Sequence, residues 1–123
     1  MKITLTNGQM LDSLSALTEA NETGKLGYAI AKNRRKIQEE IKEYLAVREE
    51  LLKKHGTETG GGQYSFTAES AERFNRELEE YAGLTTELEL MTVGTEVFCG
   101  GNLTSKQMFA LDWMEAAPDS GED

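Results

Sequence analysis

The sequence predicts an α+β fold with a long antiparallel helical hairpin, a small antiparallel sheet at one end of it, and short terminal helices. Residues 25–55 keep one uninterrupted helical period, which predicts a single long helix. Residues 68–81 repeat apolar side chains at helical spacing, which predicts a second helix that packs antiparallel on the first. Short segments with alternating polar and apolar residues predict the strands.

The long helix is the element that organises the rest of the chain. No proline interrupts it, and Gly56 follows its basic end, as is typical of a helix C-terminus. At 1.5 Å per residue it would be roughly 45 Å long, more than this chain can cover, so a homo-oligomer is expected. Its apolar stripe consists of Leu26, Ile30, Ile37, Ile41, Tyr44, Leu45, Leu51 and Leu52.

The N-terminal part of the chain predicts a strand and a short helix. Residues 2–6 alternate and carry β-branched side chains, which favours a strand. Asn7 is a good helix N-cap, and the amphipathic helix that follows should end between residues 21 and 24. Residues 56–63, with three consecutive glycines, are expected to form a linker.

The C-terminal part predicts two helices and further strands. Thr67 should cap the second helix of the hairpin, and Thr104 with Gln107 forms a capping-box pair for a last helix over residues 105–116. Strands are expected at residues 63–66 and 85–93, with a second short piece at 97–99, and these could pair with each other and with the N-terminal strand. The expected organisation is one domain over residues 1–117 and an acidic flexible tail over residues 118–123.

The charge is unevenly distributed. The chain has a net charge of −9, but residues 1–56 hold ten Lys/Arg against eight Asp/Glu, whereas residues 57–123 hold three against fourteen. The two halves can therefore attract each other within or between subunits. A net acidic chain argues against broad nucleic-acid binding.

The composition also excludes several classes of protein. We expect no membrane association, because no apolar run approaches 20 residues and the N-terminus lacks a signal peptide, and this indicates a cytoplasmic protein. One Cys and one His leave a Cys99–His55 nucleophile pair formally possible, but no catalytic residue, metal site or cofactor is predicted. A metal-dependent hydrolase that uses Glu39, Glu40 and Glu43 is a weaker alternative.

A basic cluster in the long helix is the feature most suggestive of a site. An Arg fork and an amide on the helix seam could grip a phosphate or carboxylate. The alternatives are a solvated face that pairs with acidic residues, and, for Asn33, a polar residue that sets the register of a helical interface. The candidate ligand-binding residues are Asn33, Arg34, Arg35, Lys32, Lys36 and Tyr28.

The order of these segments resembles a family of small uncharacterised proteins of tailed bacteriophages and prophages. The resemblance is carried by residues 25–33, the charged helix to Gly56, the strands at 63–66 and 86–90, and the last segment from Leu103 to Glu115. It implies a phage context, either virion assembly or interference with the host. It brings no catalytic motif.

We therefore expect a non-enzymatic, oligomeric binding protein encoded by a phage or prophage and acting in the host cytoplasm. Its expected role is counter-defence, by sequestering an anionic ligand such as a signalling nucleotide, or a host protein. The alternative is a virion assembly or tail accessory protein that acts through protein contacts.

Overall fold

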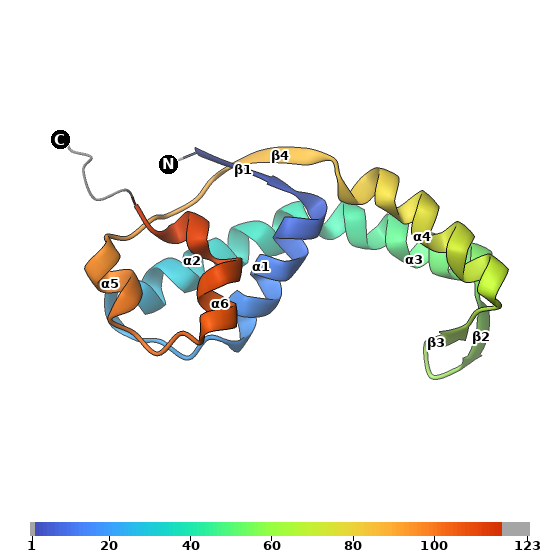
Figure 1. Cartoon of the computed structure of the whole chain (residues 1–123), viewed down its shortest axis with the longest axis horizontal. Coiled ribbons are helices and arrows are strands. Elements are labelled where there is room, and N and C mark those ends of the chain that lie inside the picture. The colour runs from blue at the N-terminus through green and yellow to red at the C-terminus, as the bar shows by residue number, and fades with distance from the viewer. Residues whose placement is uncertain (1, 117–123) are drawn as a thin grey trace.

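The computed structural model describes residues 2–116 and is an α+β structure with two parts (Figure 1). The first, which we call the head, contains β1 (Lys2–Thr6), α1 (Asn7–Glu19), α2 (Gly24–Glu40), β4 (Thr85–Glu89), α5 (Thr95–Cys99), α6 (Ser105–Ala110) and the 3₁₀ turn η1 (Asp112–Met114). The second, which we call the arm, contains α3 (Lys42–His55), β2 (Thr57–Gly60), β3 (Gln63–Ser65) and α4 (Ala68–Ala82).

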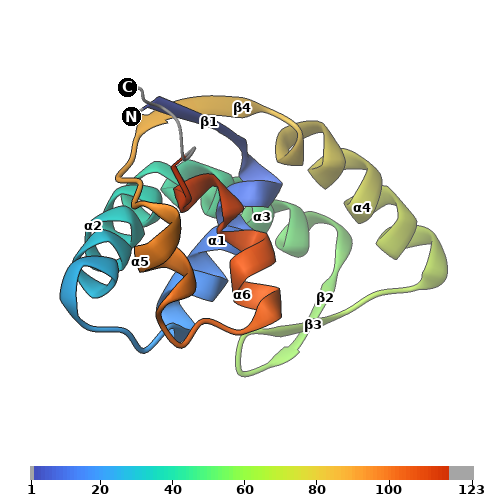
Figure 2. The ribbon, with the colours of Figure 1, turned by 60° about the vertical axis from the view of Figure 1, so that its left-hand side comes forward.

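The head holds most of the hydrophobic core. Helix α1 lies between α2 and α6 (Figure 2). Buried side chains of α1 and α2 form the centre of this core, and side chains of α6 pack against it half-buried. The antiparallel pair β1–β4 brings Leu5 and Leu88 into the same core. Thr6 caps α1 through a capping box with Gln9, one residue before the expected cap at Asn7. The largest fully buried apolar side chains are Met10, Leu17, Ile37, Ile41, Leu111 and Met114.

The arm is built from α3 and α4, which lie side by side, with a small hairpin of β2 and β3 at the far end (Figure 1). Thr67 caps α4, as the sequence predicts. Phe66 packs on Phe74, with ring centroids 5.4 Å apart, and joins the hairpin to α4. Three glycines, at positions 60 to 62, have positive φ and form the turn of the hairpin.

The prediction of one helix over residues 25–55 was wrong at one position. Ile41 separates α2 from α3, although the bonds from Ile41 N to Ile37 O and from Leu45 N to Ile41 O span the junction. Neither Pro nor Gly marks the interruption, so apolar spacing alone does not reveal it. As a consequence only α3 packs along α4, whereas α2 packs on α1 and α5.

The strands also differ from the prediction. Residues 57–60, expected within a linker, form β2 and pair with β3, so the sheet consists of two separate two-stranded pieces. The strand expected over 85–93 ends at Glu89, and the piece expected at 97–99 is part of the helix α5. The last helix has the predicted capping box at Thr104 but ends at Ala110, and its continuation is the turn η1.

No helix within residues 2–116 combines the length and the apolar character needed to cross a membrane. The acidic tail predicted over residues 118–123 lies outside the described residues.

Candidate functional site

Asn33, which lies between Ile30 and Ile37 on the apolar stripe, is buried and hydrogen-bonded through both polar atoms of its side chain. It is 1% exposed, its Nδ2 donates to the Met91 carbonyl at 3.0 Å, and the Met91 N–H donates to its Oδ1 at 2.8 Å. The side-chain amide thus pairs with the backbone as a neighbouring strand would. Asn33 therefore holds the chain after β4 against α2, and its amide is not available to a ligand.

The four basic side chains of the cluster are exposed, but they do not share one face of α2. Lys32, Arg35 and Lys36 are three and four positions apart and lie on one side of the helix. Arg34 is two positions from both Lys32 and Lys36, so it lies on the other side of the buried Asn33. Within residues 2–116, none of the four takes part in an ion pair, although Lys36 is close enough to Glu89 for its charge to act on that carboxylate. Pairing of the cluster with acidic residues of another subunit stays a prediction.

Tyr28 extends this basic side towards the start of α2. Tyr28 is 59% exposed, and the Lys32 Nζ lies 5.8 Å from the centroid of its ring, a cation–π distance. Lys25 lies one turn further towards the N-terminus on the same side. We name the set Lys25, Tyr28, Lys32, Arg35 and Lys36 the basic face of α2.

An open hollow lies beside the basic face. It has a volume of about 590 Å³ and lies between the start of α2 and the chain that follows β4. Met91, Val93 and Val97 give it apolar walls, and Gly24 and Gly94 add no side chain. Because Asn33 fixes Met91 against α2, the hydrogen bonds described above also fix one wall of the hollow. Its lining is Gly24, Lys25, Tyr28, Met91, Thr92, Val93, Gly94 and Val97.

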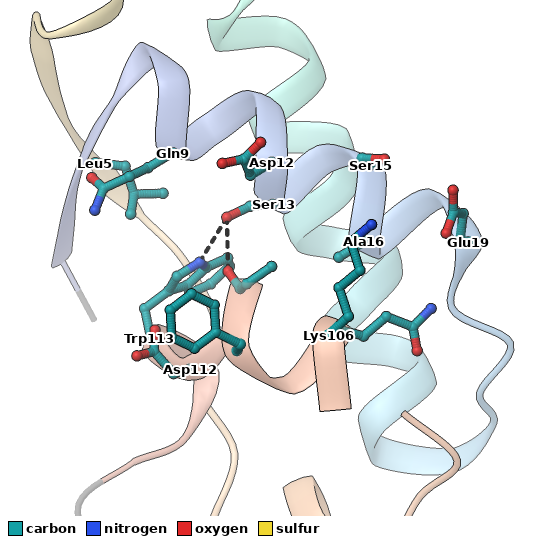
Figure 3. A pocket seen from close by; sticks show the side chains of 13 residues that line it. Leu5, Gln9, Asp12, Ser13, Ser15, Ala16, Glu19, Lys106, Asp112 and Trp113 are labelled. Atoms are coloured by element: carbon teal, nitrogen blue, oxygen red, sulfur yellow. Dashed lines mark hydrogen bonds between the residues drawn. The ribbon is translucent and has the colours of Figure 1, made fainter. Parts of the chain in front are cut away.

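A second hollow, of about 480 Å³, lies between α1 and α6 (Figure 3). At its base the Trp113 Nε1–H donates to Ser13 Oγ at 3.0 Å, and Ser13 donates to the Ala110 carbonyl at 3.2 Å. Trp113 thus helps to pack α6 and η1 against α1. The charged side chains that line the hollow are Asp12, Glu19, Asp112 and Lys106, so it is the less favourable of the two hollows for an anion.

The residues considered for catalysis are not brought together. His55 lies in the arm, 3.1 Å from Glu77, whereas Cys99 is exposed in α5 at the other end of the molecule (Figure 1). No group of three or more His, Cys, Asp or Glu side chains in the described part of the chain could hold a metal ion.

The site includes residues that the sequence did not single out. Lys25 could have been found, because it precedes Tyr28 by one helical turn. Met91, Val93 and Val97 carry no such signal, because they reach α2 only through the tertiary fold.

Comparisons of the chain with family models, with curated proteins and with solved structures give no match.

Proposed function

We propose that this chain is a non-enzymatic binding protein, encoded by a phage or prophage, that sequesters an anionic ligand carrying an aromatic ring, such as a signalling nucleotide. The observation that carries the proposal is the position of an exposed tyrosine and exposed basic side chains beside an open apolar hollow. The phage setting rests on the resemblance of the sequence segments, and counter-defence is the role that such sequestration would serve.

The basic face supplies the two interactions that a nucleotide needs. Lys32, Arg35 and Lys36 form a row of cations that can hold phosphate oxygens, and Arg35 can do so with two parallel hydrogen bonds. The ring of Tyr28 offers a face on which a base can stack at the mouth of the hollow. Asn33 serves this site indirectly, as the residue that holds the Met91 wall in place.

The test is native mass spectrometry of protein purified gently from cells, followed by calorimetric titration with the nucleotide that the adduct identifies. Removing the ring (Tyr28→Ala) or one cation (Lys32→Ala) should weaken binding about tenfold or more, which corresponds to about 1.4 kcal/mol. Arg34→Ala is the matched control, because it removes one positive charge from the other side of the same helix and should change affinity less than about twofold.

Two results would contradict the proposal. The first is a wild-type protein that carries no adduct and binds none of a pool of nucleotides. The second is an equal loss of affinity for Lys32→Ala and Arg34→Ala, because binding would then reflect only the overall charge of α2.

A second candidate function is a virion assembly or tail accessory protein that acts through protein contacts. The specific observation in its favour is the arm, which projects from the head and covers its own apolar side chains incompletely (Figure 1). Co-purification from infected cells with a stoichiometric virion protein, and without any nucleotide, would favour this candidate over sequestration.

A further inference from the structure

The basic face of α2 has cations on both sides of its aromatic ring. Lys25 precedes Tyr28 by one helical turn, and Lys32 follows it by one turn, with its Nζ 5.8 Å from the ring centroid. Arg35 and Lys36 lie one turn beyond Lys32. A ligand whose base stacks on Tyr28 therefore meets positive charge in both directions along the helix.

The row of cations has a limited length. From Lys25 to Lys36 the helix rises by about 16 Å. An acidic side chain follows, since Glu39 comes one turn after Lys36 and forms an ion pair with Lys42 at 3.0 Å. Glu89 is also close enough to Lys36 for the two charges to interact. The row therefore has room for a few phosphates and does not continue into a surface for a long polyanion.

The hollow beside Tyr28 has room for a second aromatic ring. Its volume of about 590 Å³ is within the range of sites that hold small molecules. Met91, Val93 and Val97 give it apolar walls. Because every base has an apolar ring face, an aromatic ring and an apolar hollow accept one base as readily as another.

The backbone of these walls is already hydrogen-bonded within the protein. The N–H and carbonyl of Met91 are both bonded to the Asn33 side chain. The Val93 N–H donates to the Met114 carbonyl, and the Val93 carbonyl accepts from the Ala116 N–H, both at 2.8 Å. These groups are satisfied by the fold, so they are not open to the edge of a base.

The side chains that line the hollow add little that could distinguish one base from another. In the described part of the chain, only Lys25, Tyr28 and Thr92 among them carry hydrogen-bonding groups. Lys25 is a cation suited to phosphate, and the two hydroxyls can each donate or accept. Bases differ in the donors and acceptors on their edges, and a hydroxyl that serves as either does not select one pattern.

We infer that the basic face binds a phosphodiester-linked dinucleotide with a 5′-phosphate, recognised by its phosphates and ring faces and independently of the identity of its bases. Because this is the ligand of the same site, the inference rests on the proposed function. One base stacks on Tyr28, and the other enters the hollow.

The charges of the two phosphates match the cations on each side of the ring. The bridging phosphate, a diester with one negative charge, lies at Lys25 beside the hollow. The 5′-phosphate, a monoester with a charge of about −1.5 to −2 at neutral pH, lies at the row from Lys32 to Lys36. A mononucleotide would leave either Lys25 or this row without a phosphate.

Calorimetric titration of the full chain tests the inference with three probes. They are the 5′-phosphorylated adenylyl dinucleotide, the corresponding guanylyl dinucleotide and adenosine 5′-monophosphate. The adenylyl dinucleotide should bind about tenfold more tightly than the monophosphate, because it adds one base and one phosphate contact. The two dinucleotides should bind with affinities within about threefold of each other.

Lys25→Ala tests the phosphate on the hollow side of the ring. It should weaken binding of the adenylyl dinucleotide about tenfold and change binding of the monophosphate less than about twofold, because the monophosphate uses the row beyond Tyr28. Arg34→Ala is the matched control. It removes the same charge from the other side of α2 and should change neither affinity more than about twofold.

Two kinds of result would overturn the inference while nucleotide binding itself remains. The first is equal affinity for the dinucleotide and the monophosphate, or an equal loss for both probes in Lys25→Ala. The second is a preference for one base of more than about tenfold, which would require groups that recognise base edges. If no probe binds, the inference is overturned, and the proposed function is then decided by whether native mass spectrometry finds an adduct.

Discussion

The head and the arm are both helical, but they are stabilised in different ways. In the head, α1 and α2 pack with α6 and the β1–β4 pair, so side chains such as Leu17 and Ile37 are fully buried. In the arm, α3 and α4 pack mainly on each other, and α4 has no buried side chain. Amphipathic periodicity is present in both parts, so periodicity identifies a helix but does not tell how many neighbours cover it.

The comparison implies that the head carries most of the stability of the chain. Burial of apolar surface contributes roughly 25 cal/mol per Å², and the head has far more fully buried side chains than the arm. We expect the arm to fray first and the head to unfold last.

The largest difference in stability between head and arm should appear when an apolar side chain is truncated to alanine in each part. Ile37→Ala, in the head, should lower the free energy of unfolding by about 3 kcal/mol, because it leaves a cavity among buried side chains. Leu52→Ala, in the arm, should cost about 1 kcal/mol, because Leu52 is only half-buried. Urea unfolding followed by circular dichroism measures both.

If Ile37→Ala and Leu52→Ala lowered the free energy of unfolding equally, the head would not be more completely covered than the arm, contrary to our inference. To keep self-association from contributing, both variants are measured in the dilute, monomeric range.

A smaller effect is expected at the polar contact inside the head. Asn33→Ala removes two hydrogen bonds and leaves the N–H and carbonyl of Met91 without their partner. It should therefore cost about 2 kcal/mol. Asn75→Ala, at an exposed position of α4, is the control and should change stability by less than about 0.5 kcal/mol. Comparable losses for the two asparagine variants would show that the Met91 contact does not stabilise the head.

The smallest effect concerns acid and the arm. The hydrogen bond from Lys54, with further contributions from the charge of Lys54 and from His55, holds the pKa of Glu77 below its ordinary value of 4.5. A carboxyl group with a lowered folded-state pKa stabilises the fold above its unfolded-state pKa, and this contribution is lost as the pH falls through the folded-state value. Acidification below about pH 4.5 should thus loosen the arm.

Hydrogen exchange of α3 and α4 amides, measured across the acid range, checks this expectation. Glu77→Gln should reduce the acid dependence in the arm, whereas Glu80→Gln, at an exposed position of the same helix, should not. An arm whose acid dependence is the same in wild type and Glu77→Gln would remove Glu77 as the cause.

The sequence predicts where helices and strands occur better than it predicts which of them pack together. The capping residues Thr67 and Thr104 correctly mark two helix starts, because a cap is a local interaction. The interruption at Ile41 and the separation of the sheet into two pieces depend on which elements meet in space, and no local residue marks them.

The candidate site shows the same limit. The helical spacing of Tyr28, Lys32 and Lys36 is sufficient to place them on one side of α2. Asn33 forms its hydrogen bonds with the backbone of Met91, 58 positions further along the chain. Helical spacing cannot predict such a long-range contact. Burial of a polar residue on an apolar stripe can be predicted, but its partner cannot.

The junctions of the arm have a consequence for how this chain can vary. The chain leaves the head after Ile41, and its return is fixed where the Asn7 N–H donates to the Leu84 carbonyl at 3.0 Å. Adding seven residues to α3 and seven to α4 would extend the reach of the molecule by about 10 Å and leave every core side chain of the head in place. Insertions and deletions in the arm can therefore change the length of the molecule without changing the basic face.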